Sequence, residues 1–247
     1  MSVLAPSRLG DFFSQYLAPF SSHVHRNVEM VCALMTARCL VTQEHLERTA
    51  IYADGMAEIF GLSRERRRAL RIGALLHDVG KMGVPDEILH KPGRLTAAEF
   101  NVMKLHPQIG EHILAQNHFP VGVTDCVRWH HERWGGRGYP DGLKGKEIPI
   151  TARILAVVDC YDAVREDRPY RAGMDRQEAI DVLRCGSETM FEPLIVKAFV
   201  QNLHKFEREI ERHKVSYTPS RIAPSTLTAE ARAVEPPQGL DPPPLKA

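Results

Sequence analysis

Three kinds of reactive group occur within one short stretch of the chain: an imidazole, a carboxylate and an ammonium, in the run His77-Asp78-Val79-Gly80-Lys81. Imidazole nitrogens and carboxylate oxygens are ligands for borderline divalent metals such as Fe, Mn and Zn. The carboxylate of Asp78 has two oxygens and can therefore bridge two ions. A His-Asp dipeptide alone predicts little, because most such pairs are incidental. Its interpretation as a metal site depends on further ligands elsewhere in the sequence.

Such ligands follow at intervals along the chain: His106, the pair His130-His131, and Asp159. A histidine on an apolar stripe is more often a core residue than a ligand, but two adjacent histidines followed by Glu132 favour ligation. The carboxylate of Asp159 falls on an apolar helical face with Ala152, Leu155, Ala156 and Ala163. An unpaired carboxylate on such a face costs several kcal/mol. A metal ion is the simplest partner, and a plain helical scaffold would have no use for this group.

Helices must position these residues, because apolar residues recur at helical spacing and no alternating strand pattern occurs. Thr42 caps a helix that Gly61 ends, and Ser63 caps the next helix, which carries His77 and Asp78 to its buried C-terminal end. His106 lies at a helix junction, since Pro107 disfavours helical geometry before it and opens the next helix. The other predicted elements are helices over 27–41, 123–134, 150–164 and 193–212, loops over 79–95 and 135–149, and helices opened by Thr96-Ala97-Ala98-Glu99 and by Asp175.

Composition bounds the class of protein. The chain has 247 residues, of which 43% are apolar, and its 32 basic and 31 acidic residues give no whole-chain argument for binding DNA, RNA or a membrane. The five cysteines are dispersed, which favours free thiols in a reducing compartment. The apolar stretch over 30–41 is too short to span a bilayer, and no signal peptide opens the chain. We therefore expect a cytoplasmic protein.

These patterns predict an all-α fold, a bundle of roughly seven to nine helices with a metal site in its core. Residues 1–41 form an N-terminal helical segment of unknown role, which either packs on the main domain or makes a dimer contact. Residues 42–212 form the main domain, which carries the candidate ligands. Residues 213–247 form a Pro-rich tail that we expect to be disordered. The arginines between 64 and 71 are interpreted as a solvated helix face.

The motifs together resemble the HD-GYP family, a branch of the HD-domain metal-dependent phosphohydrolases, over residues 42–210. Besides the His-Asp run, the resemblance rests on Lys91-Pro92-Gly93-Arg94-Leu95-Thr96, His130-His131-Glu132-Arg133-Trp134, Gly138-Tyr139-Pro140-Asp141-Gly142-Leu143, Ile148-Pro149 and Arg168-Pro169-Tyr170-Arg171. The family hydrolyses cyclic di-GMP, a bacterial second messenger. The resemblance therefore implies a phosphodiesterase that makes linear pGpG or, after a second cut, GMP.

The resemblance also implies a ligand set for two divalent ions, Fe or Mn. The family's upstream histidine matches His45, and the remaining positions match the motifs above; the full set is His45, His77, Asp78, His106, His130, His131 and Asp159. The implied nucleophile is a hydroxide that bridges the two ions. Lys81 would stabilise charge on the phosphate or protonate the leaving oxygen. The predicted substrate-binding residues are Gly138, Tyr139, Pro140, Asp162, Arg168 and Arg171, with Gly138 admitting a close approach and Tyr139 offering a ring for stacking.

The sequence departs from the family pattern at three places. Some members place a third-metal Glu where this chain has Val41, so we expect two ions. Where the family usually has Asp-Gly-Ser or a similar triplet, this chain has Gly135-Gly136-Arg137. The family often has Thr after Asp-Ala-Leu, whereas here Val164 is followed by Arg165. The last two changes lie near the expected substrate mouth and affect substrate affinity rather than metal binding.

Two other readings stay open from the sequence. A phosphohydrolase acting on another nucleotide would keep the metals but lack the Gly138-Tyr139-Pro140 loop. A non-catalytic module would bind the dinucleotide or dock onto a protein, against which the intact ligand set argues. The partners we expect are cyclic di-GMP and diguanylate cyclase-type signalling proteins, with a homodimer as an open alternative.

Overall fold

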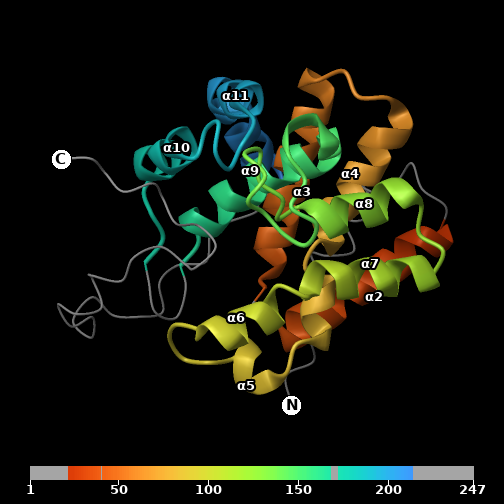
Figure 1. The fold of residues 1–247 in the computed structure, drawn as a ribbon. Coiled ribbons are helices and arrows are strands. Elements are labelled where there is room, and N and C mark those ends of the chain that lie inside the picture. Colours follow the sequence, from red (N-terminus) through yellow and green to blue (C-terminus); the bar gives the residue numbers. More distant parts are fainter. Residues whose placement is uncertain (1–21, 40, 168–171, 214–247) are drawn as a thin grey trace, which may run out of the picture.

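The computed structural model describes residues 22–39, 41–167 and 172–213, and the chain over these residues is helical (Figure 1). Its helices are α2 (Ser22–Arg38), α3 (Gln43–Ile59), α4 (Arg64–Leu76), η1 (Val79–Gly83), α5 (Asp86–Leu89), α6 (Ala97–Met103), α7 (His106–Gln116), α8 (Val121–Trp129), η2 (Gly145–Glu147), α9 (Ile150–Arg165), α10 (Arg176–Cys185) and α11 (Pro193–Arg212). Nine of the α-helices have seven or more residues. The only β pairing in the described part is an isolated bridge between Ser187 and Phe191. The all-α prediction is confirmed.

Four helix starts lie where the sequence predicts them. The Thr42 side chain accepts a hydrogen bond from the His45 N–H at 3.1 Å, and Ser63 does the same for Arg66 at 3.3 Å. Capping boxes open α6 and α10, formed by Thr96 with Glu99 and by Asp175 with Glu178. Because each cap satisfies backbone N–H groups that have no partner within the helix, it fixes where the helix begins.

The core lies where α3 packs against α4, α9 and α11. The ring of Tyr52 on α3 is fully buried and meets the edges of Tyr161 on α9 and Phe199 on α11, with centroids 5.7 and 5.3 Å apart. Such edge-to-face contacts add roughly 0.5–1.5 kcal/mol each to the burial of the rings. The helices that carry the predicted ligands are therefore held by one continuous core.

The N-terminal helix belongs to the same core. Three side chains of α2 are fully buried (Val28, Cys32 and Met35), and the helix packs against α4 and η1. Arg38 at its C-terminal end donates to the Val84 carbonyl at 3.0 Å. Of the two roles that the sequence leaves open for this segment, packing on the main domain therefore applies to α2.

Four predicted elements differ from the structure. Helix α2 spans Ser22–Arg38 instead of 27–41. The predicted loop over 79–95 contains η1 and α5, and the predicted loop over 135–149 contains η2. Helix α8 ends at Trp129, so Trp134 does not continue its stripe. The backbone N–H of Trp134 instead donates to the Met190 carbonyl at 3.0 Å, a tertiary contact that helical spacing does not report.

Several predictions fall outside the described residues, namely the tail beyond His213, the first 21 residues, and Arg168 and Arg171. Within the described ranges, none of the helices has both the length and the apolar character needed to cross a bilayer.

Candidate metal centre

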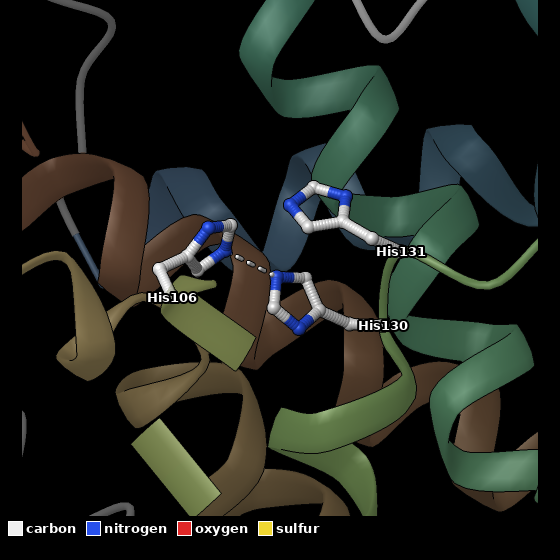
Figure 2. A group of neighbouring side chains, drawn as sticks. All are labelled: His106, His130 and His131. Carbon is white, nitrogen blue, oxygen red and sulfur yellow. Dashed lines mark hydrogen bonds between the residues drawn. The ribbon is translucent and has the colours of Figure 1, made fainter. Parts of the chain in front are cut away.

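Six of the seven predicted ligands form two triads in the described part of the chain. His45, His77 and Asp159 make the first triad, and His106, His130 and His131 make the second. Within each triad one nitrogen or oxygen atom per residue lies within 4.8 Å of the others. Figure 2 shows the second triad, in which the imidazole of His106 on α7 meets those of the adjacent residues His130 and His131.

The seventh ligand, Asp78, lies between the triads. Its Oδ2 atom is 3.5 Å from His77 Nε2 in the first triad, and its Oδ1 atom is 3.5 Å from His106 Nε2 in the second. The Asp78 side chain is only 6% exposed. One carboxylate thus turns one oxygen to each triad, which is the arrangement that a bridging ligand requires.

Close helix packing brings Asp78 to this position. A Cβ atom on Gly80 would lie 1.8 Å from the His106 carbonyl oxygen and 2.5 Å from the Gly110 nitrogen. Only glycine therefore lets η1 approach the start of α7 this closely. The packing of η1 on α7 places Asp78 beside His106, although 28 positions of sequence separate them.

Three of the histidines are oriented in the same way. Their Nδ1–H groups donate to the carbonyl three residues earlier: His77 to Ala74 at 2.8 Å, His106 to Met103 at 2.9 Å, and His130 to Val127 at 2.7 Å. Since a carbonyl only accepts, each Nδ1 carries a proton, and Nε2 is the atom that each ring directs to the centre. Such hydrogen bonds fix the tautomer and ring orientation of metal-binding histidines.

His45 is oriented by a carboxylate. Its Nδ1–H donates to Asp162 Oδ2 at 2.8 Å, and Arg48 donates to both oxygens of the same carboxylate at 2.7 and 2.8 Å. Arg48 and Asp162 are both fully buried. Glu166 extends this network, since its carboxylate lies 3.5 Å from Arg48 and accepts from the Thr42 hydroxyl.

The two triads differ in the pKa values of their histidines. Burial lowers the pKa of His106 to about 3 and that of His130 to about 4, and it also lowers the pKa of His131 far below the usual range. Burial acts on His77 in the same direction, but the carboxylates of Asp78 and Asp159 outweigh it and raise its pKa to about 9. At neutral pH the second triad is therefore a set of neutral imidazoles.

Two observations fit bound cations. His106 Nε2 and His130 Nε2 lie 3.3 Å apart, the contact drawn as a dashed line in Figure 2. Because both rings carry their protons on Nδ1, two lone pairs face each other across this gap, and a cation between them would relieve the repulsion. In addition, His77 Nε2 is buried without a hydrogen-bond partner. Imidazole and carboxylate donors suit Fe, Mn or Zn, so the residues present fit a pair of divalent ions.

Lys81 lies beside the bridging position. Its Nζ atom is 2.6 Å from Asp78 Oδ2, and its side chain is 27% exposed, so it joins the centre to solvent. Burial raises the pKa of Asp78, but the cation of Lys81 and the neighbouring imidazoles outweigh it and hold that pKa well below the usual range. Lys81 therefore helps to keep the Asp78 carboxylate ionised.

The loop with Gly138, Tyr139 and Pro140 borders the second triad. A Cβ on Gly138 would lie 2.4 Å from both the Arg133 nitrogen and the Glu132 Cα. Gly138 therefore lets the loop pack closely against the backbone of Glu132 and Arg133. Tyr139 stacks on His131 with ring centroids 4.8 Å apart and an interplanar angle of 30°. The Tyr139–Pro140 bond is cis.

One predicted role does not fit the structure. Asp162 was expected to bind substrate, but its side chain is fully buried and its oxygens are engaged by His45 and Arg48. It acts behind His45. Arg48 was not predicted at all, although a signal exists: Arg48 follows His45 by three residues, as Asp162 follows Asp159. On two packed helices this equal spacing places the ion pair one turn from the ligands.

Comparisons with known proteins identify the family of the chain. Residues 29–195 match the family model described as HD domain. A cyclic di-GMP phosphodiesterase of Thermotoga maritima is 38% identical over 202 residues, which cover 81% of this chain and 53% of that protein. A cyclic di-GMP phosphodiesterase response regulator of Xanthomonas campestris is 44% identical over 170 residues, covering 68% and 45%. The chain thus spans about half the length of these curated relatives.

Solved structures agree on the fold. The crystal structure of a cyclic GMP-AMP specific phosphodiesterase of V. cholerae superposes with a TM-score of 0.55 at 17% identity, covering 77% of this chain and 54% of that one. At this identity the likeness concerns the fold alone. Together with the family model and the curated relatives, it leads to one conclusion: the chain belongs to the HD-GYP branch of the HD domain family.

Proposed function

We propose that this chain is a metal-dependent phosphodiesterase that hydrolyses cyclic di-GMP. The observation that carries the proposal is the arrangement of two ligand triads around one carboxylate, with Asp78 Oδ2 and Oδ1 each 3.5 Å from a histidine of a different triad. A paired centre of this kind suits phosphodiester cleavage, in which charge develops on both the attacking and the leaving oxygen. The names of the two curated relatives support cyclic di-GMP as the substrate.

The ions, when bound, would supply Lewis-acid polarisation of the phosphodiester and a water nucleophile that is active at neutral pH. The protein's own contribution is to hold the ligands and to supply a proton. Lys81 is partly exposed beside Asp78, so its ammonium lies at the solvent side of the centre. We assign Lys81 to stabilising charge on the phosphate oxygens or to protonating the leaving ribose oxygen.

We further propose two ions per chain, Fe or Mn, and linear pGpG as the accumulating product. Val41 is buried at the position where some family members have a third-metal carboxylate, and valine cannot ligate. After the first cut the linear product is more flexible and carries an additional terminal charge. A site with two ions should bind that product less productively than the cyclic substrate. Val41→Glu is therefore expected to admit a third ion and to speed the second cut.

The test combines elemental analysis of protein purified without oxygen with a time course of products. We expect about two ions per chain and disappearance of cyclic di-GMP with accumulation of pGpG. Three tightly held ions, or GMP appearing as fast as cyclic di-GMP disappears, would contradict the argument from Val41. Binding of cyclic di-GMP without hydrolysis in the metal-loaded protein would instead indicate a non-catalytic module.

The same assay separates the substrate alternatives. Cyclic GMP-AMP and a deoxynucleoside triphosphate should be tested beside cyclic di-GMP at equal concentrations. Cyclic GMP-AMP is included because the V. cholerae phosphodiesterase with a similar fold is named as specific for it. Preferential cleavage of either competitor would assign the site to another nucleotide. Diguanylate cyclase-type partners and a homodimer stay predictions, which pull-down and light-scattering measurements on the loaded protein would address.

A further inference from the structure

The five histidines of the centre are not held in the same way. Four of them donate an Nδ1–H group to a protein oxygen, which is a carbonyl for His77, His106 and His130 and a carboxylate for His45. Within the described residues, the ring of His131 makes no hydrogen bond of this kind. Its ring instead contacts three other rings, those of His106, His130 and Tyr139. A metal ligand without an orienting hydrogen bond needs some other contact to fix its rotation.

Tyr139 supplies such a contact. Its ring stacks on that of His131, with centroids 4.8 Å apart and an interplanar angle of 30°. Phe100 makes a T-shaped contact with Tyr139, with centroids 6.4 Å apart and an interplanar angle of 81°. The His131 ring also meets His106 edge-on at 4.9 Å. His130 is a third ring neighbour, with centroids 4.1 Å apart and an interplanar angle of 41°. These ring contacts together leave the His131 ring little freedom to rotate about its χ2 angle.

Glu132 holds the loop that carries Tyr139. Its side chain is 3% exposed, and its Oε1 atom accepts from the backbone N–H groups of Asp141 and Gly142 at 2.7 and 2.9 Å. The Asp141 carboxylate in turn accepts from Arg128 and from the Trp129 indole at the end of α8. The loop is thus fastened, directly after Pro140, to the segment that presents His131.

From these contacts we infer that Tyr139 is a positioning residue for His131 and that Glu132 holds Tyr139 in place. The Gly138-Tyr139-Pro140 turn thus supports the second metal site indirectly, through His131. The inference rests on the proposed function only in requiring that the second triad binds an ion. It differs from the role expected from sequence, in which the Tyr139 ring stacks on the substrate, because one face of that ring is already covered by His131.

The test measures Mn²⁺ affinity without substrate, with one triad disabled at a time. In the chain carrying His45→Ala, only the second triad is complete, and there Tyr139→Leu should weaken Mn²⁺ binding about tenfold, the lower end of the usual effect of removing an outer-shell partner. In the chain carrying His130→Ala, where only the first triad is complete, the same substitution should change the affinity less than about twofold. Tyr139→Phe keeps the ring and should bind Mn²⁺ in both backgrounds like its parent.

A second variant guards against misfolding of Tyr139→Leu, which circular dichroism would reveal. Asp141→Ala removes the side-chain bonds to Arg128 and Trp129 at an exposed position, and it should weaken the second site in the same direction by several-fold. Unchanged Mn²⁺ affinity in both variants, or a loss of cyclic di-GMP affinity in the fully loaded Tyr139→Leu chain without any loss of metal, would overturn the inference and leave the proposed function standing. Absence of Mn²⁺ binding by the unsubstituted chain would overturn both.

Discussion

The two triads present nitrogen and oxygen atoms at similar spacing but are held by different contacts. The first triad contains the carboxylate of Asp159, and its His45 is oriented by the buried ion pair between Asp162 and Arg48. The second triad is all imidazole, oriented by two backbone carbonyls and one stacked ring. Both triads use backbone carbonyls, at His77 in the first, but only the first adds a buried ion pair and only the second adds a stacked ring.

This difference has consequences for how each site responds to change. Buried charges depend strongly on their partners, so a single isosteric substitution that removes charge should disturb the first triad. Backbone carbonyls cannot be removed by substitution, so the second triad should tolerate charge changes nearby and respond to lost packing. Asp78 is common to both sites, and it alone should affect both equally.

The largest effect is expected from Asp78→Ala. This substitution removes the carboxylate that faces both triads, so both ions should be lost together with hydrolysis of cyclic di-GMP. Elemental analysis and a product assay would measure the two losses. Near-normal turnover in this variant would refute the shared centre and with it the comparison of two linked triads.

A smaller and one-sided effect is expected from Asp162→Asn. The amide has a single, uncharged oxygen, which can accept a hydrogen bond from Arg48 or from His45 but cannot give each of them a charged oxygen. The hydrogen bond that orients His45 is therefore weakened. We expect Mn²⁺ affinity of the first triad to fall about tenfold or more, with the second triad within about twofold. Because Arg48 loses a buried partner, the free energy of unfolding should also fall by about 3 kcal/mol.

Titration calorimetry of Asp162→Asn in the His130→Ala and His45→Ala backgrounds would separate the two sites, and urea unfolding would give the stability. Equal losses of affinity at both triads would show that Asp162 acts on the whole centre through stability. In that case the division into a charge-held and a packing-held site is wrong.

The smallest effect on metal binding is expected from Asp54→Asn, which is the matched control. Asp54 accepts from Arg67 at 2.6 Å and from Arg71 at 2.5 Å in an ion pair that touches no ligand. It lies nine residues after His45 on α3, about 13 Å along the helix axis. Mn²⁺ affinity at both triads should therefore stay unchanged, while the free energy of unfolding falls by about 1–2 kcal/mol.

The pH dependence of this control has a defined sign. Burial raises the pKa of Asp54, but hydrogen bonds and charge from Arg67 and Arg71 outweigh it, so the folded-state pKa lies below the usual value. A depressed pKa contributes stability that is present above the unfolded-state pKa of about 4 and is lost as pH falls through the folded-state pKa. The stability difference between Asp54→Asn and its parent should therefore shrink in acid, which urea unfolding between pH 7 and pH 3 would measure.

Much of the fold could be predicted because its signals are local. Thr42, Ser63 and the capping boxes at Thr96 and Asp175 each act within one helical turn, so their residues alone fix where helices begin. The types of the ligands were also readable, since imidazole and carboxylate groups on apolar stripes are costly without a partner. The prediction that the arginines between 64 and 71 form a solvated helix face is only partly right, because Arg67 and Arg71 form ion pairs with Asp54.

The grouping of the ligands was beyond local signals. His45 and Asp159 approach to 3.5 Å although 114 positions separate them, and the contact exists only because α3 packs against α9. The same packing buries Arg48 and turns the Asp162 carboxylate toward His45. Likewise, whether the Tyr139 ring lies on a ligand or on a substrate depends on how its loop folds back over Glu132. Residue types and short-range spacing set the available chemistry, whereas distances between side chains on different helices follow from the packing of the whole core.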